Sequence, residues 1–204
     1  MRCARWALAA GVVLPCALAV SACELGDLLG TPGTKPVVVQ YLGDTLLVAA
    51  EVTAPVASAT ADGSPIPGAR FAYASSDTSI LAINPGEALA ARARGTAALT
   101  VALADPLLPQ NPPSVTRTIR VVAASLTLDL TSATLKRIGD TLTLHATPLN
   151  ALGQPIAGSA SWQSSDTTVV AVSQAGLLTA LATGAATVRA FLDLDTAACQ
   201  VTVR

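Results

Sequence analysis

The chain has 204 residues, of which 51% are hydrophobic and only 12% charged, and its formal net charge at pH 7 is −1. Since no basic cluster is present to neutralise phosphates, this composition argues against nucleic acid as a partner. Many Val, Leu, Ala and Thr residues, with Gly, Pro, Asn and Asp grouped at short intervals, predict an all-β chain of short strands.

Residues 1–22 have the composition of an export signal peptide. Arg2 and Arg5 supply positive charge, and Trp6–Val20 is an apolar run too short to span a bilayer comfortably. The following Val20-Ser21-Ala22-Cys23 resembles the lipobox of bacterial lipoproteins. This resemblance implies that Cys23 becomes an acylated N-terminus, which would anchor the chain to a membrane; an ordinary cleaved signal is the alternative.

Residues 23–36 are expected to form a tether between the lipid and the first folded domain. Gly and Pro recur so closely in this segment that neither a helix nor a strand can propagate. The residue after Cys23 is Glu24 rather than Asp, which in lipoproteins disfavours retention in the inner membrane. The resemblance therefore implies lipid anchoring to the cell envelope, at the outer membrane or the cell surface.

The four cysteines do not provide a disulfide framework. Cys3 and Cys16 lie in the signal and Cys23 would carry lipid, which leaves Cys199 without an intramolecular partner. Cys199 alternates in step with Val201 and Val203, and this parity predicts a small hydrophobic residue buried on the last strand. A reactive or intermolecular thiol is the alternative.

The remaining sequence contains two copies of one pattern, which predict domains at 37–122 and 123–204. Gly43-Asp44-Thr45-Leu46 matches Gly139-Asp140-Thr141-Leu142, Ser75–Thr78 matches Ser164–Thr167, and Gly95 matches Gly184. The spacing between the first two anchors is longer in the first copy. We therefore place an inserted connection at Ala54–Gly68, because loops tolerate insertion better than strands do.

Alternation of apolar and polar residues predicts which side chains face each core. In the second copy Leu142, Leu144 and Ala146 face inward, and the matched residues Leu46, Val48 and Ala50 are expected to do so in the first. Phe71 and Tyr73 in the first copy, and Trp162 in the second, supply an aromatic ring to the centre of each core. Each copy has the size of an immunoglobulin-like β-sandwich.

The motifs of the second copy resemble the group 2 bacterial immunoglobulin-like domain. They are Gly139–Leu142, Gly153–Gly158, Trp162-x-Ser-Ser-Asp, Val-Ala-Val, Gly176–Ala180 and Gly184 followed by Ala-Thr-Val. The first copy departs from this pattern at Tyr73, at Asn84–Glu87 and in the enlarged loop Ala104–Ser114. The resemblance implies a surface or periplasmic module of adhesins, invasin-like proteins and lipoproteins, serving as spacer, adhesive arm or carbohydrate-contacting accessory.

The polar motifs include residue types that can act in catalysis. His145, the single histidine, has the outward parity of its strand and no nucleophile beside it in sequence. The Ser-Ser-Asp-Thr motif recurs in both copies without a nearby histidine, which favours turns in which Ser and Asp accept backbone N–H groups. We therefore predict no catalytic residues and a protein that is not an enzyme.

The sequence predicts no cofactor and no metal site. Asp193 and Asp195 place two carboxylates near a strand end, but calcium prefers six to eight oxygen ligands. A solvated turn is therefore the favoured interpretation, with a weak calcium site as the alternative.

Leu107 and Leu108 stand in the proline-rich loop Ala104–Ser114, where they either pack at the domain junction or contact a partner. The predicted function is a non-enzymatic surface-displayed or periplasmic lipoprotein whose domains act as an adhesive or structural arm, joined to the membrane through its N-terminal lipid and bound to a protein or glycan ligand. The alternative is a carbohydrate or envelope-polymer binding module. An open face shared by Tyr41 and Phe191 would support that alternative.

Overall fold

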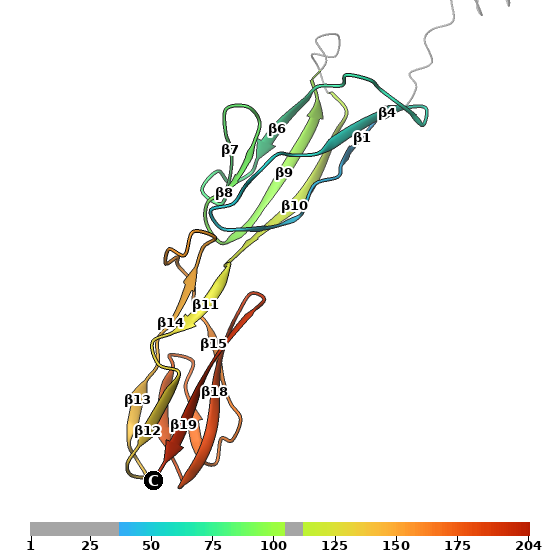
Figure 1. The fold of residues 1–204 in the computed structure, drawn as a ribbon. Helices are drawn as coiled ribbons and strands as arrows, with labels where there is room; N and C mark the ends of the chain where they lie inside the picture. The colour runs from blue at the N-terminus through green and yellow to red at the C-terminus, as the bar shows by residue number, and fades with distance from the viewer. Residues whose placement is uncertain (1–36, 105–111) are drawn as a thin grey trace, which may run out of the picture. The chain divides into compact units, whose positions relative to one another are not determined.

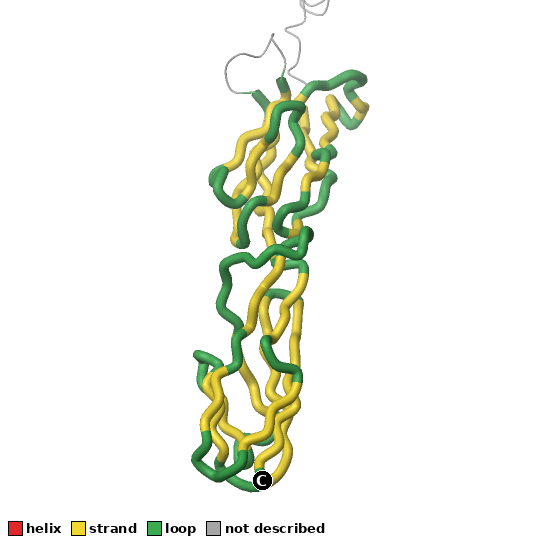
Figure 2. Tube along the Cα trace, turned by 60° about the vertical axis from the view of Figure 1, so that its left-hand side comes forward, coloured by secondary structure: helices red, strands yellow, loops and turns green. Residues whose placement is uncertain are grey.

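The computed structural model describes residues 37–104 and 112–204, and in this part of the chain it contains strands and no helix (Figures 1 and 2). Accordingly, no helix in the described residues is long and apolar enough to cross a membrane. Cys23, Leu107 and Leu108 lie outside the described residues. Residues 37–204 form one contact unit, and their strands group into two sets of three sheets. The all-β fold with two tandem sandwiches is therefore confirmed.

The strands of the first sandwich pair in the orders β1-β4-β5, β2-β10-β9-β6 and β3-β8-β7. Strand β2 runs parallel to β10, and the other pairs are antiparallel. Their bounds are β1 Val37–Tyr41, β2 Leu46–Val48, β3 Val52–Thr53, β4 Ala57–Ala61, β5 Ser64–Pro65, β6 Phe71–Ser75, β7 Leu81–Ile83, β8 Leu89–Ala91, β9 Gly95–Leu103 and β10 Ser114–Val122.

The second sandwich repeats this topology with sheets β11-β14, β12-β19-β18-β15 and β13-β17-β16. Here β12 runs parallel to β19, as β2 does to β10. The bounds are β11 Ser125–Leu128, β12 Ser132–Leu135, β13 Thr141–Thr143, β14 Ala146–Leu149, β15 Ser161–Ser164, β16 Val170–Val172, β17 Leu177–Ala180, β18 Gly184–Leu192 and β19 Asp195–Val203.

The hydrogen-bond register corrects the alignment of the two copies. Gly139 N donates to Ala180 O, and in the first sandwich it is Ala50 N that donates to Ala91 O. Both residues adopt positive φ, 93° and 70°. The carboxylate of the next residue then accepts backbone N–H groups: Asp140 Oδ2 from Lys136 N, and Glu51 Oε2 from Val48 N. Ala50-Glu51, not Gly43-Asp44, is therefore the counterpart of Gly139-Asp140.

With this correction no insertion remains at Ala54–Gly68. Ala59 corresponds to Pro148, because Ile66 N donates to Ala59 O as Ile156 N donates to Pro148 O, and the segment between acceptor and donor is one residue shorter in the first copy than in the second. The extra length of the first copy falls instead between β9 and β10, whose ends are Leu103 and Ser114, whereas β18 and β19 are joined by a two-residue turn.

The predicted inward faces are confirmed in the second sandwich and wrong in part of the first. Leu144 is buried and His145 is exposed, as the alternation predicted. In β2, however, Leu47 is buried while Leu46 is exposed, one position out of phase with the prediction. The error follows from the misplaced motif, because a shift of one residue moves every side chain of a strand to the opposite face.

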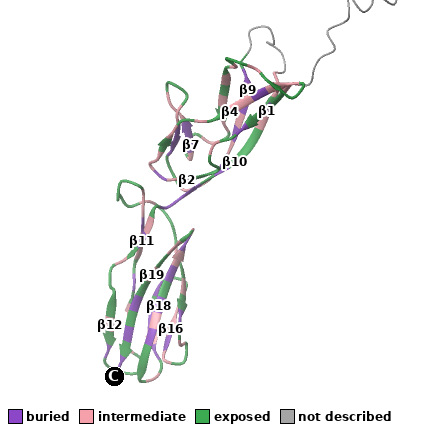
Figure 3. Ribbon diagram, turned by 45° about the vertical axis from the view of Figure 1, so that its right-hand side comes forward, coloured by how far each residue is buried: buried purple, intermediate pink, exposed green. Residues whose placement is uncertain are grey.

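Aliphatic side chains form the centre of each core, and buried and exposed residues alternate along the strands (Figure 3). Leu47, Leu99 and Ile119 are fully buried in the first sandwich, and Leu178 and Val188 in the second. The aromatic rings of Phe71, Tyr73 and Trp162 pack against these cores but are only half-buried. The prediction that rings fill the core centres is therefore wrong.

Cys199 lies on β19 with no exposed surface, which confirms its predicted burial. Burial, with a smaller effect of the nearby Asp129 charge, raises the pKa of its thiol. Because the thiolate is the reactive form, this environment favours an inert structural cysteine over the alternative of a reactive thiol.

Candidate functional site

The two Ser-Ser-Asp motifs form matching turns, each of which joins an edge strand of one sheet to an edge strand of another, β6 to β7 and β15 to β16. Ser164 Oγ accepts from Asp166 N at 3.3 Å, and Asp166 Oδ1 accepts from Thr168 N at 2.9 Å. Ser165 Oγ accepts from Thr187 N of β18 at 2.8 Å. In the first sandwich Ser75, Asp77 and Ser79 form the corresponding turn, and Ser76 Oγ accepts from Ala98 N of β9 at 2.8 Å. The motif is a folding element, as the sequence predicted.

We expect Ser165→Ala to lower the free energy of unfolding by about 1 kcal/mol, because the Thr187 amide loses its side-chain acceptor. Ser76→Ala removes the equivalent bond in the first sandwich and should have a similar effect. Urea denaturation of both variants measures the loss. Unfolding midpoints equal to that of the parent protein would show that these bonds are replaced by water without loss of stability.

His145 has no catalytic partner in the described structure. Its side chain is exposed, while its backbone N–H donates to Asp129 Oδ1 at 3.0 Å. Asp140 caps its own turn by accepting from the amides of Lys136 and Arg137. Among residues 37–104 and 112–204, no group of three or more His, Cys, Asp or Glu side chains is placed to hold a metal.

Asp193 is not the solvated turn residue that the sequence predicted. It begins the two-residue turn between β18 and β19, and its carboxylate accepts from Arg94 at 2.7 Å (Nε to Oδ2) and 2.9 Å (Nη2 to Oδ1). Arg120 Nη2 approaches Oδ1 at 3.3 Å, and Ala123 N donates to Oδ2 at 3.0 Å. The side chain is only 8% exposed. This set of contacts links the second sandwich to the first.

These donors hold the pKa of Asp193 at about 2, below its ordinary 3.8. The side-chain hydrogen bond from Arg94 is the main cause; burial acts in the opposite direction, and the Ala123 amide and the charge of Arg94 add to the lowering. Asp193 therefore stays ionised at neutral pH. Both carboxylate oxygens accept hydrogen bonds from protein donors, so the role of this carboxylate is to join the two sandwiches.

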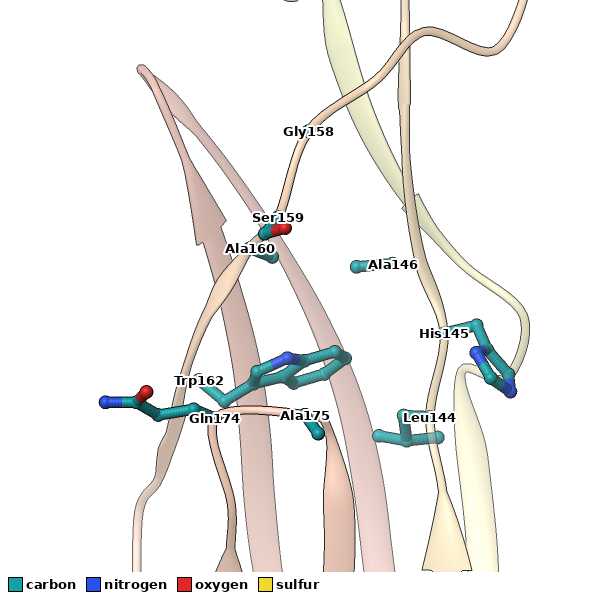
Figure 4. Close-up of a pocket in the computed structure, with 9 residues that line it drawn as sticks. All are labelled: Leu144, His145, Ala146, Gly158, Ser159, Ala160, Trp162, Gln174 and Ala175. Atoms are coloured by element: carbon teal, nitrogen blue, oxygen red, sulfur yellow. The ribbon is translucent and has the colours of Figure 1, made fainter.

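A cleft of about 190 Å³ opens over Trp162 in the second sandwich (Figure 4). The indole ring lies across the gap between the segment that leads into β15 and the segment that leads into β14. Small side chains border the ring, with Ala160 on one side and Ala146 on the other. The complete lining consists of Leu144, His145, Ala146, Gly158, Ser159, Ala160, Trp162, Gln174 and Ala175.

The polar groups of this cleft are not used by the fold. Neither the Ser159 hydroxyl nor the Trp162 indole N–H makes a hydrogen bond to another described residue. Ser159 turns its hydroxyl toward the gap, whereas the His145 ring and the Gln174 amide lie at the rim and point away (Figure 4). The cleft thus offers an aromatic surface with polar groups that remain available to a ligand.

The first sandwich has a hollow that only partly overlaps the corresponding place, and its lining is different. Tyr73 pairs with Val101 as Trp162 pairs with Ala190, so Phe71 stands where the second sandwich has Ala160. Phe71 lines a hollow of about 250 Å³ together with mainly apolar residues of the β4–β6 region. The replacement of Phe71 by Ala160 removes the ring that would stand beside Trp162.

The open face shared by Tyr41 and Phe191, which would have supported the carbohydrate alternative, is not formed. Tyr41 is 7% exposed and its hydroxyl donates to Asp44 O at 3.1 Å. Its ring therefore belongs to the first core.

Neither the Asp193 contacts nor the Trp162 cleft was predicted from the sequence. Arg94 and Asp193 are 99 residues apart, and no local pattern connects them. The cleft had a visible signal, since aligning the Ser-Ser-Asp anchors places Ala160 opposite Phe71.

Comparison with known proteins agrees with this architecture. Residues 122–203 match the family model described as bacterial Ig-like domain (group 2), so the second sandwich is similar to domains of that class. No curated protein matches the chain.

Solved structures with a similar fold include domains 4 and 5 of the S-layer protein SbsC, at 16% identity over 82% of this chain and 97% of that one, with a TM-score of 0.37. The D00-D0 domain of intimin matches at 16% identity over 82% and 97%, with a TM-score of 0.36. The Escherichia coli adhesin FdeC matches at 14% over 84% and 65%, also with 0.36. The chain spans 28% of a longer SbsC structure. Likenesses at this level do not define a function.

Proposed function

We propose that the chain is a non-enzymatic lipoprotein, displayed at the cell surface or in the periplasm, whose two sandwiches act as an adhesive or structural arm. The observation that carries this proposal is the match of residues 122–203 to the bacterial Ig-like domain. The contacts of the polar motifs support it, because Ser164, Ser165 and Asp166 stabilise a turn and Asp193 joins the two sandwiches.

The anchor of this arm is the lipid that we propose for Cys23. Replacing Cys23 with serine should abolish acylation, and mass spectrometry of the N-terminus should then show no acyl chains. The variant should also move from the membrane fraction to the soluble fraction, because the lipid supplies the membrane affinity. Cys199→Ser is the matched control and should leave acylation unchanged, since Cys199 is buried in the second core. An unmodified Cys23 in the parent protein would overturn the proposal of lipidation.

The ligand of the arm is proposed to be a protein or a glycan, with Leu107 and Leu108 as contact residues. Pull-down and glycan-array assays with the chain separate these classes. A protein partner whose capture is lost on Leu107→Ser and Leu108→Ser supports the adhesive arm. Reproducible glycan binding without a protein partner supports the alternative of a carbohydrate or envelope-polymer binding module.

A further inference from the structure

We propose that the cleft over Trp162 binds one neutral pyranose ring of a polysaccharide. This inference rests on the alternative function of a carbohydrate-binding module, to which it gives a site, and it does not depend on lipidation of Cys23. It starts from three features of the described structure: a half-buried indole, an unpaired hydroxyl at Ser159, and a volume of about 190 Å³.

The chemistry of the lining matches a sugar ring. A pyranose has an apolar face of C–H groups and an edge of hydroxyl groups. The Trp162 ring offers an apolar face to the C–H groups of the sugar. The sugar hydroxyl groups can accept a hydrogen bond from the indole N–H and can donate to or accept from the Ser159 hydroxyl. Such a combination of an aromatic surface with a few convergent polar groups is typical of a ligand site.

The lining also argues against other ligands. None of the nine lining residues is Asp, Glu, Lys or Arg. The Arg94 guanidinium lies beside Gly158 but is already paired with Asp193, so the lining offers no unpaired charge to a phosphate or a carboxylate. Pockets for larger organic molecules have volumes of roughly 300–1,000 Å³, and this cleft is smaller. It is also open to solvent beside the exposed Gly158 and Ser159, which suits one unit of a chain whose remaining units stay outside.

The first sandwich shows that the fold accepts a large ring at the position of Ala160. Phe71 occupies the position of Ala160 there, on an edge strand of the same topology. Ala160→Phe in the second sandwich would place a ring beside Trp162 and fill the space proposed for the sugar. Ser58→Ala, which alters the hollow of the first sandwich, is the matched control.

The test is saturation-transfer NMR and calorimetry on the full chain, kept in a detergent without a sugar headgroup. The probes are the methyl glycosides of glucose, galactose, mannose and N-acetylglucosamine. At least one probe should bind saturably to the parent and to Ser58→Ala. Ala160→Phe should weaken this binding more than tenfold, and Ser159→Ala should weaken it about two- to tenfold through the loss of one hydrogen bond.

Absence of binding by all four glycosides overturns the proposal, as does unchanged binding by both Ala160→Phe and Ser159→Ala. If Ala160→Phe fails to fold, as judged by its circular dichroism, Ser159→Ala decides alone, because Ser159 is exposed and its replacement leaves the core untouched. Binding is measured on the purified chain. A failure here therefore leaves the arm and its anchor unaffected, and Cys23→Ser should bind the sugar as the parent does.

Discussion

Asp193→Asn is expected to lower the free energy of unfolding at pH 7 by about 2 kcal/mol. The carboxylate accepts two hydrogen bonds from Arg94 and one from the Ala123 amide, while its side chain is 8% exposed. The pKa of Asp193 is about 2, below the ordinary 3.8. Since one pKa unit equals about 1.4 kcal/mol, this difference means that folding favours the ionised form of Asp193 by about 2 kcal/mol. Asparagine keeps one acceptor oxygen but directs an NH₂ group at the guanidinium groups.

The loss is measured as the shift in urea midpoint, with Asp195→Asn as the matched control. Asp195 lies two residues further along the same hairpin, at the start of β19, and its replacement should change stability by less than about 0.5 kcal/mol. Equal effects of the two substitutions would show that the Asp193 contacts do not contribute to stability beyond a general loss of negative charge.

The Asp193 contribution should depend on pH in a defined direction. Because the folded pKa lies below the unfolded value, the stabilisation is fully present above about pH 5 and is lost as the pH falls through 3.8 toward 2. The difference in stability between the parent and Asp193→Asn should therefore be largest near neutral pH and close by about pH 2. A difference that stays constant from pH 7 to pH 2.5 would contradict the assignment of this effect to the ionised carboxylate.

The sequence was sufficient to predict the fold because the strongest patterns are local. The alternation of Leu142, Leu144 and His145 indicates which residues face the core from one sheet. The two Ser-Ser-Asp motifs indicate a turn whose hydrogen bonds lie within a few residues. Such patterns depend on neighbours in the chain, and the structure confirms them.

Aligning the two copies by identical residues gave a wrong match where different residues adopt the same backbone conformation. Gly43-Asp44 resembles Gly139-Asp140, but Ala50 adopts the positive φ and Glu51 supplies the carboxylate that caps the turn. A left-handed conformation is most often taken by glycine, so alanine in that place gave no signal. The first-copy faces were therefore assigned one residue out of phase.

The features that distinguish this chain depend on residues that are distant in sequence or on a side chain that is small. Asp193 meets Arg94 and Arg120 only once both sandwiches are folded. The cleft over Trp162 is bordered by the small Ala160, whereas the first sandwich has Phe71 at that position. Composition and periodicity report what a residue contributes locally, so they carry no signal for the Asp193 contacts, and the cleft has a signal only in the alignment of the two copies.

Gly176→Ala is expected to lower the free energy of unfolding by about 3 kcal/mol, and the loss should come mainly from a collision. Gly176 has φ of 78° and is buried, and its carbonyl accepts from Leu144 N at 3.0 Å. A Cβ built there would lie 2.9 Å from Trp162 Cζ2 and still closer to the Leu144 carbonyl oxygen. Either the backbone or the ring must move, which is the kind of overpacking that costs about 1–3 kcal/mol, in addition to the conformational strain of about 1 kcal/mol.

The matched control separates strain from collision. Gly153 has φ of 73°, and a Cβ there would meet nothing within 4 Å, so Gly153→Ala carries the strain alone and should cost about 1 kcal/mol. The first sandwich agrees with this division, because Glu87 stands at the counterpart of Gly176 and keeps its side chain at φ of 67°. Thermal or urea denaturation of the two variants measures both costs. Equal losses of stability for Gly176→Ala and Gly153→Ala would show that the Trp162 ring can move away from the added methyl group without cost. The Gly176 turn would then not fix the position of the ring.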